Sequence, residues 1–151
     1  MPWRPHATAA AVIEERGRFL LVEELADGRT VLNQPAGHLE PGESLIDAVC
    51  REVLEETAHR FRPEGLVGIY LYPHPDPSSG ITYLRVCFHG PSLGHDPERP
   101  LDEGIIRPLW LTRDELAAAP ERLRSPMVLR CIDDYLCGRR FPLDLLNHCI
   151  D

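Results

Sequence analysis

The stretch that decides the fold runs from Gly37 to His59 and has the sequence GHLEPGESLIDAVCREVLEETAH. Its first six residues include two glycines and a proline, which break regular structure. Ser44 then occupies a position that suits a helix cap, with Asp47 three residues later in a variant of the capping box. Apolar residues follow at helical spacing, at positions 46, 49, 50 and 53. The pattern predicts a helix over residues 44–57 with one buried side.

Three glutamates share another side of this predicted helix. Glu52, Glu55 and Glu56 lie at positions i, i+3 and i+4, which form one helical face. Like charges at i and i+4 repel each other by about 0.2–0.5 kcal/mol. A solvated acidic surface is one explanation. The other is a site for Mg²⁺, which prefers oxygen ligands and retains substrate phosphates in its coordination shell. The adjacent Arg51 and the nearby Glu43 favour the second explanation.

The order of these residues resembles the signature of the Nudix hydrolases, G-x5-E-x7-R-E-U-x-E-E-x-G-U, where U is a bulky aliphatic residue. Seven of its nine fixed positions match within residues 37–59. The departures are Ala58, where the signature has glycine, and His59, where it has an aliphatic residue. The glycine serves the helix exit, where a left-handed backbone favours glycine. Alanine in that conformation would cost about 1 kcal/mol, so we expect the exit turn to be reshaped.

The resemblance implies a role for each matching residue. Glu52, Glu55 and Glu56 would coordinate Mg²⁺, for which Mn²⁺ is expected to substitute, with help from the carbonyl of Gly37. Arg51 would orient these carboxylates, and Glu43 would pair with Arg51. The metal would neutralise the diphosphate and lower the pKa of the attacking water.

Further residues are assigned to the substrate and to proton transfer. Gln34, Gly37 and His38 are predicted substrate contacts. Many Nudix enzymes take a general base from a loop near a late strand, where Asp102 and Glu103 form an acidic pair. We favour Glu103 because its side chain is longer, and Glu52 is the alternative base.

Segments outside the signature are similar to the NudJ-type phosphatases within the Nudix family. They are Pro5–Thr8, Asn33–Glu40, Leu123–Pro126 and Gly138–Leu143. This similarity implies hydrolysis of hydroxymethylpyrimidine diphosphate, a thiamine precursor, and of nucleoside di- and triphosphates, with release of orthophosphate. Leu32 stands where we expect tryptophan in these enzymes. If that tryptophan stacks on a base, the substrate preference of this chain differs.

Two rival functions stay open. The first is a Nudix module that binds a nucleotide without catalysis, although such modules usually lose members of the glutamate set that this chain keeps. The second is a hydrolase with another substrate, such as an oxidised nucleotide or a dinucleotide. The sequence leaves the choice of substrate undecided.

The composition sets the wider limits. The chain has 151 residues, which fits one domain over 1–151, and 43% of them are hydrophobic. A formal net charge of −8 argues against binding a nucleic acid polymer. No apolar run is long enough to predict a membrane helix or a signal peptide. Five cysteines without a C-x-x-C pair suggest free thiols in a reducing cytoplasm. The resemblance allows a monomer or a homodimer.

The remaining elements predict an α/β (α+β) Nudix fold, with a mixed β-sheet sandwiched between helices. Residues 8–13 and 19–23 are expected to form a hairpin, and further strands are expected over 30–32, 65–72, 81–89 and 107–111. Helices are expected over 113–119 and 125–137. Arg85 is interpreted as a surface residue of a strand, Trp110 as a core residue, and Trp3 as either a substrate stacker or a loose terminal residue.

Overall fold

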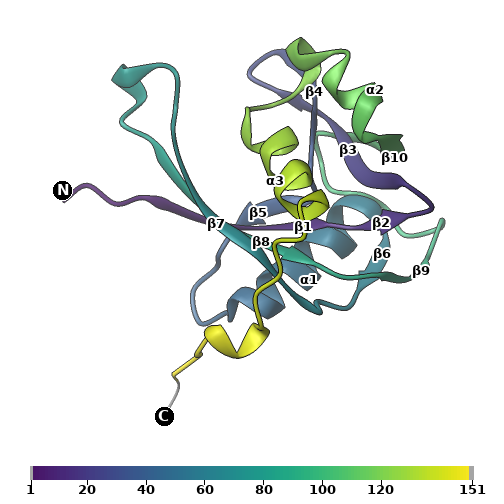
Figure 1. Ribbon diagram of the computed structural model, residues 1–151. Helices are drawn as coiled ribbons and strands as arrows, with labels where there is room; N and C mark the ends of the chain where they lie inside the picture. Colours follow the sequence, from purple (N-terminus) through teal and green to yellow (C-terminus); the bar gives the residue numbers. More distant parts are fainter. Residues whose placement is uncertain (1, 150–151) are drawn as a thin grey trace.

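The computed structural model describes residues 2–149 (Figure 1). Its helices are α1 (Leu45–Thr57), α2 (Arg113–Ala117) and α3 (Met127–Leu136), with short 3-10 turns η1 (Pro77–Ser79), η2 (Pro120–Arg122) and η3 (Leu143–Leu145). Its strands are β1 (His6–Val12), β2 (Glu14–Glu15), β3 (Arg18–Ala26), β4 (Arg29–Asn33), β5 (Ala36–His38), β6 (His59–Phe61), β7 (Gly65–Pro73), β8 (Thr82–His89), β9 (Ser92–His95) and β10 (Ile105–Thr112).

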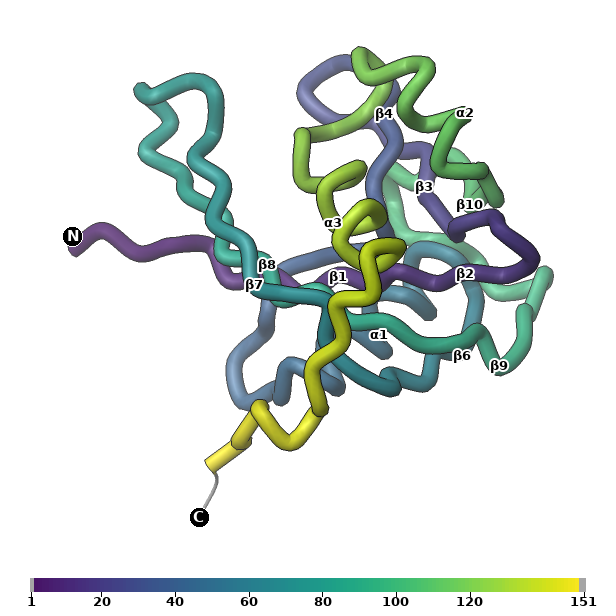
Figure 2. The backbone as a smooth tube through the Cα atoms, viewed as in Figure 1, coloured from purple at the N-terminus to yellow at the C-terminus, as the bar shows by residue number. Residues whose placement is uncertain are grey.

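A four-stranded sheet with the order β5-β1-β8-β7 forms the centre of the molecule. β1 and β8 run parallel, while β1 pairs antiparallel with β5 and β7 pairs antiparallel with β8. Helix α1 lies on one side of this sheet and α3 on the other (Figures 1 and 2). The predicted fold class, a mixed sheet between helices, is therefore confirmed.

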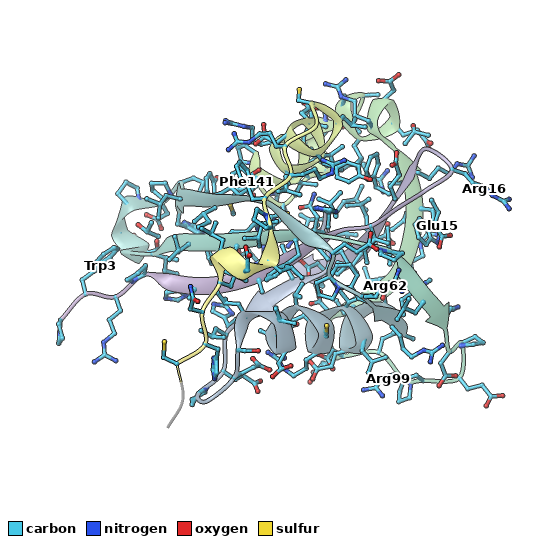
Figure 3. All side chains as sticks on the ribbon, turned by 60° about the horizontal axis from the view of Figure 1, so that its bottom comes forward. Trp3, Glu15, Arg16, Arg62, Arg99 and Phe141 are labelled. Atoms are coloured by element: carbon cyan, nitrogen blue, oxygen red, sulfur yellow. The ribbon has the colours of Figure 1, made fainter. Side chains whose placement is uncertain are left out.

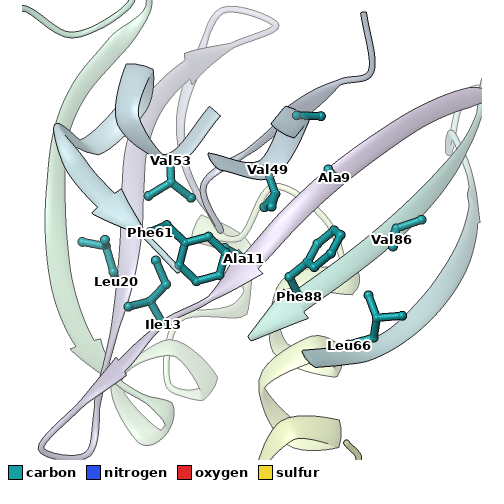
Figure 4. Close-up of a cluster of buried hydrophobic side chains, with 11 residues drawn as sticks. Ala9, Ala11, Ile13, Leu20, Val49, Val53, Phe61, Leu66, Val86 and Phe88 are labelled. Atoms are coloured by element: carbon teal, nitrogen blue, oxygen red, sulfur yellow. The ribbon is translucent and has the colours of Figure 1, made fainter. Parts of the chain in front are cut away.

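The alternation of side chains along β1 divides the core into two parts. Ala9 and Ala11 point toward α1 and pack in a cluster with Val49 and Val53 of that helix (Figure 4). Val12 points the other way and packs with residues of α3. Since successive residues of a strand face opposite sides, both faces of β1 are buried, and the strand is apolar at nearly every position.

A second sheet has the order β10-β3-β2, with β4 paired to β3. The predicted hairpin between residues 8–13 and 19–23 is wrong for most of its length. Only the two residues of β2 pair with β3, across the turn at Arg16 and Gly17. The apolar first half belongs to the central sheet instead, where β5 and β8 flank it and α1 and α3 cover its two apolar faces.

The helices agree with the sequence more closely than the short strands do. Ser44 caps α1 by accepting a hydrogen bond from the Asp47 backbone N–H, and Thr112 and Glu115 form a capping box at α2. α3 begins at Met127, two residues later than predicted. β5, β6 and β9 were not predicted, since three or four residues carry too little periodicity. No helix in residues 2–149 has the length and apolar character needed to cross a membrane.

The exit of α1 differs from expectation. Ala58 keeps the left-handed conformation, with φ of 58°, and its N–H bonds to the carbonyl of Leu54 at 3.0 Å. The prediction of a reshaped turn is therefore wrong. The methyl group of Ala58 is buried, and its burial offsets part of the conformational cost.

Candidate active site

A cavity of about 520 Å³ opens between the central sheet, the second sheet and the start of α3. One end is acidic, where Glu52 and Glu56 of α1 reach the cavity beside Gly37 of β5. The other end carries the buried Arg85 of β8, with Tyr72 and Tyr83 on the hairpin formed by β7 and β8. Both ends belong to one continuous space, which suits a ligand with two unlike halves.

The acidic end is built by the close approach of α1 to β5. A Cβ added at Gly37 would collide with the carboxyl group of Glu52, so a larger residue here would require that carboxyl group to move. The backbone N–H of Ala36 donates to Glu56 Oε1 at 2.9 Å. Strand β5 thus fixes the position of Glu56 and leaves room for Glu52.

Arg51 organises the carboxylates around it. Its Nε donates to Glu43 Oε2 at 2.6 Å and its Nη2 to Glu43 Oε1 at 3.0 Å. Its Nη1 donates to Glu52 Oε1 at 2.7 Å and to Glu55 Oε2 at 3.2 Å. A further bond from Nη2 reaches the carbonyl of His38 at 3.1 Å. The geometry matches the orienting role expected for Arg51 and the pairing role expected for Glu43.

The electrostatics of these groups follow from burial and crowding. Burial, followed by the charges of Glu24, Glu52 and Asp102, raises the pKa of Glu56 to about 9. Burial also raises the pKa of Glu52, against the opposing effect of Arg51. By contrast, the hydrogen bond to Arg51 lowers the pKa of Glu43. With its pKa at about 9, Glu56 retains its charge near neutral pH only beside additional positive charge.

The donor set fits a hard divalent cation. Glu52, Glu55, Glu56 and the nearby Asp102 offer carboxylate oxygens. The carbonyl of Gly37, which was expected to help them, faces β1 instead, because Gly37 and Ala9 form a hydrogen-bonded pair of the ladder between β1 and β5. Oxygen donors without sulfur or imidazole match Mg²⁺ or Mn²⁺. Within residues 2–149, no three acidic, His or Cys side chains already converge as a finished metal site. The reason is visible at Arg51, whose Nη1 lies between Glu52 and Glu55.

Two of the predicted substrate contacts, His38 and Gln34, have different surroundings. His38 lines the cavity, and burial, with smaller contributions from His6 and Arg124, lowers its pKa. Gln34 is only 1% exposed and does not line the cavity. Its side chain donates to the Val128 carbonyl and accepts from Arg85, so its position is behind the cavity wall. Gln34 was predicted to contact the substrate directly, but in the structure it supports Arg85 instead.

In the loop before β10, Asp102 contacts α1, whereas Glu103 was the predicted base. The Asp102 N–H donates to the carbonyl of Glu55 at 3.0 Å, which anchors the loop against α1. Burial and then the adjacent Asp102 carboxyl raise the pKa of Glu55. Glu103 lies one residue further, in an exposed turn, and none of the α1 glutamates takes a pKa shift from it. Asp102 is therefore the acid of this loop that contacts α1, and the role of Glu103 as a base stays a prediction.

The structure also places four residues whose surroundings were interpreted from the sequence. Arg85 is 4% exposed, so its interpretation as a surface residue is wrong. Leu32 is buried in the core that faces α3 and does not line the cavity, so this position provides no stacking surface for a base. Trp3, labelled in Figure 3, is 63% exposed and donates its indole N–H to Gly80 outside the cavity. The partial burial of Trp110 against the core confirms its predicted role.

Comparisons with known proteins agree with this arrangement. The model of the NUDIX domain family matches residues 3–130. The phosphatase NudJ of Escherichia coli K12 is 36% identical, with 96% of this chain and 92% of the relative covered. A NUDIX hydrolase from Nitrosomonas europaea is 52% identical with a TM-score of 0.93, covering 97% of this chain and 98% of that one. A MutT NUDIX hydrolase from Burkholderia pseudomallei shares the fold, at 20% identity and a TM-score of 0.69, over 87% of this chain and 98% of that one.

Proposed function

Because this chain belongs to the NUDIX family and is a hydrolase of phosphoanhydride bonds, we propose that it requires Mg²⁺ and acts on hydroxymethylpyrimidine diphosphate and on nucleoside di- and triphosphates. Orthophosphate is a product of the proposed reaction. The domain that carries it spans residues 1–151, with the signature at 37–59. We place the enzyme in the cytoplasm, as a monomer or a homodimer, in keeping with its free cysteines.

One observation carries the proposal. The carboxyl group of Glu52 occupies the space that a side chain at position 37 would need, and burial raises the pKa of both Glu52 and Glu56. A protein gains nothing in stability by crowding buried acids unless a positive ligand compensates them. A divalent cation with a bound diphosphate provides that compensation.

Each residue of the acidic end has a task in this proposal. Glu52, Glu55 and Glu56 would hold Mg²⁺. When bound, Mg²⁺ supplies charge neutralisation of the phosphates and a lowered pKa for the attacking water. Arg51, fixed by its two bonds to Glu43, positions Glu52 and Glu55. Positioning and electrostatic stabilisation account for most of the rate in phosphoryl transfer.

A carboxylate must also accept the proton of the attacking water. We assign this role to Asp102, whose carboxyl lies beside Glu55, or to Glu52, which lines the cavity. Both lie at the acidic end, where a water and the diphosphate would meet. A base at this place needs hydrogen-bond reach to that water, and Asp102 is favoured over Glu103 because its carboxyl acts on Glu55.

The test is a substrate panel assayed separately for orthophosphate and pyrophosphate. We expect turnover of hydroxymethylpyrimidine diphosphate and of nucleoside di- and triphosphates with Mg²⁺ or Mn²⁺, and none in excess chelator. Full turnover in chelator would exclude the metal requirement. Turnover of dinucleotides or oxidised nucleotides alone would assign another substrate class. Binding of these compounds without any release of phosphate would make the chain a non-catalytic module.

A further inference from the structure

The arginine at the far end of the cavity has an unusual environment. Arg85 lies on β8 and is 4% exposed. Its Nη1 donates to Gln34 Oε1 at 2.8 Å, and its Nη2 donates to Asn33 Oδ1 at 3.1 Å. Both of these partners are neutral amides, and the Cys131 thiol lies 4.0 Å from Nη1 as a weak third acceptor. Its Nε–H is buried and has no hydrogen-bond partner among the described residues.

The second arginine of the cavity shows what is missing at Arg85. Arg124 forms an ion pair with Glu24 at 2.9 Å. Within residues 2–149, no carboxylate forms such a pair with Arg85. Buried guanidinium groups are normally paired, and a buried donor without an acceptor costs stability. A cavity that retains both features is prepared to donate hydrogen bonds to a ligand.

The support of Arg85 makes it a rigid donor. Gln34 Nε2 donates to the carbonyl of Val128 in α3 at 2.7 Å, which turns Gln34 Oε1 toward Arg85. Asn33 holds the other terminal nitrogen. With two of its N–H groups fixed by amides, the guanidinium plane is set before any ligand enters. Such preorganisation favours a planar partner with acceptors at its edge.

The position of Arg85 separates it from the acidic end. In the central sheet, Thr8 of β1 is opposite His38 of β5 on one side and Arg85 of β8 on the other. Two strand spacings amount to roughly 10 Å between the backbones of His38 and Arg85. Phosphates held at the α1 glutamates would therefore lie at one end of the cavity, and the group attached to them would extend toward Arg85.

Aromatic side chains complete this end. Tyr83 is two residues before Arg85 on β8, so both side chains face the same side of the sheet. Tyr72 of β7 is directly opposite Tyr83 in the register, and both tyrosines line the cavity. Aromatic faces bind flat rings, while a guanidinium donates to ring nitrogen or carbonyl oxygen atoms.

We propose that Arg85, held by Asn33 and Gln34, forms a subsite for a heteroaromatic ring of the pyrimidine type and determines specificity by donating hydrogen bonds to acceptor atoms of that ring. The inference rests on the proposed function, because it assigns the organic half of the same diphosphate substrate. Gln34 and Asn33 are positioning residues in this subsite. Arg85 selects a ring with acceptors over a hydrocarbon ring of the same size.

The first experiment measures binding without turnover. Calorimetry in excess chelator compares hydroxymethylpyrimidine monophosphate with benzyl phosphate, which has a ring of equal size without acceptors. The wild-type protein should bind the pyrimidine compound about tenfold more tightly or better. Arg85→Met should remove this preference. Arg124→Met, which removes a cavity arginine that already has a carboxylate partner, should retain it.

The second experiment measures kcat/KM for hydroxymethylpyrimidine diphosphate and benzyl diphosphate with Mg²⁺. Arg85→Met should lower kcat/KM about tenfold or more for the pyrimidine substrate and leave the benzyl substrate nearly unchanged. Arg85→Lys, which keeps the charge but loses the planar donor set, should also reduce the preference. Circular dichroism and thermal unfolding establish that each variant is folded.

The outcomes separate this inference from the proposed function. Equal losses on both rings would overturn the inference and assign Arg85 to the phosphates or to packing. No preference of the wild-type protein between the two monophosphates would also overturn it, even if Arg85→Met failed to fold. A preserved binding preference without turnover of any diphosphate would support the ring subsite and refute the proposed function instead.

Discussion

The acidic end and the arginine end of the cavity have opposite charges, and they differ in how far apart in the sequence their residues lie. Glu52, Glu55 and Glu56 come from two turns of α1, and their organiser Arg51 belongs to the same helix. Arg85 obtains its partners from positions 51 and 52 residues away in the chain, and Gln34 is held by a residue 94 positions away. Short residue spacings within one helix determine the acidic half of the site, whereas the arginine half forms only when distant segments of the chain fold together.

Both ends hold charge that the protein itself leaves incompletely compensated. At the acidic end, the compensation would come from a cation. At the arginine end, hydrogen-bond acceptors of a ligand would serve. Variants at each end should therefore affect different steps: the chemical step at one end and the choice of ring at the other.

The largest effect is expected at the acidic end. Glu56→Gln should lower kcat at least about a hundredfold, roughly 2.7 kcal/mol of barrier, because the amide lacks the charge needed to hold the metal. The melting temperature should stay the same or rise, since an amide oxygen still accepts the Ala36 N–H and the cost of burying an ionisable carboxyl group is removed. Steady-state kinetics and thermal unfolding provide the measurements.

The control for this variant is Glu15→Gln, which changes an exposed glutamate at the end of β2 (Figure 3). It should leave kcat unchanged. The preference of Glu56→Gln for hydroxymethylpyrimidine monophosphate over benzyl phosphate should also persist in chelator. Loss of that preference would show that the acidic end and the arginine end do not act independently.

The second effect tests how far the acidic end extends beyond α1. Asp102→Asn should lower kcat by about 10²-fold, the lower range for a positioned base, while Glu103→Gln should leave kcat near the wild-type value. The two variants remove one charge each from adjacent residues, so they are a matched pair. A pH–rate profile measures both. The reverse result would restore Glu103, and two unaffected variants would assign the base to Glu52.

How much could be predicted from the sequence follows from the same contrast. The helix α1, its Ser44 cap and its acidic face depend on spacings of three and four residues, which a single segment reveals. The fold class followed from the resemblance and from the apolar strands. The pairing of β1 did not, because an apolar run does not state which strands flank it.

The arginine end could not be predicted for a physical reason. An arginine in a β-rich run is usually at the surface, and only the packing of β8 against β4 and α3 buries Arg85. The choice between Asp102 and Glu103 depended on the backbone direction of one turn. A weak signal was present in the adjacent amides Asn33 and Gln34, which are rarely buried without a polar partner.

The third effect concerns stability at the end of α1, where His59 replaces an aliphatic residue. His59 is buried, stacks on His95 at 4.5 Å and bonds Ser92. Burial, followed by His95, lowers the pKa of His59 to about 4. The unfolded chain therefore binds more protons between pH 6.5 and 4, and stability must fall as the pH falls through this window.

We expect His59→Leu to reduce the loss of unfolding free energy between pH 7.5 and pH 5 by about 1 kcal/mol. Urea denaturation at both pH values measures it. His148→Leu, in the exposed C-terminal segment, should leave the pH dependence as it is. The value of kcat at pH 7.5 should not change with His59→Leu. A drop in kcat would show that the catalytic region extends beyond the end of α1.

The smallest effect is expected at Ala58, the other departure from the family signature. The left-handed conformation costs alanine about 1 kcal/mol or somewhat more relative to glycine. The buried methyl group returns about 0.8 kcal/mol. Ala58→Gly should therefore change the free energy of unfolding by less than about 0.5 kcal/mol. Ala48→Gly, which removes a buried methyl from the regular part of α1, should destabilise the protein by about 2 kcal/mol. Equal destabilisation by both variants in urea titrations would mean that residue 58 is not left-handed in solution. A near-zero value for Ala58→Gly alone would explain how this chain tolerates alanine where its family has glycine, with the acidic face of α1 left intact.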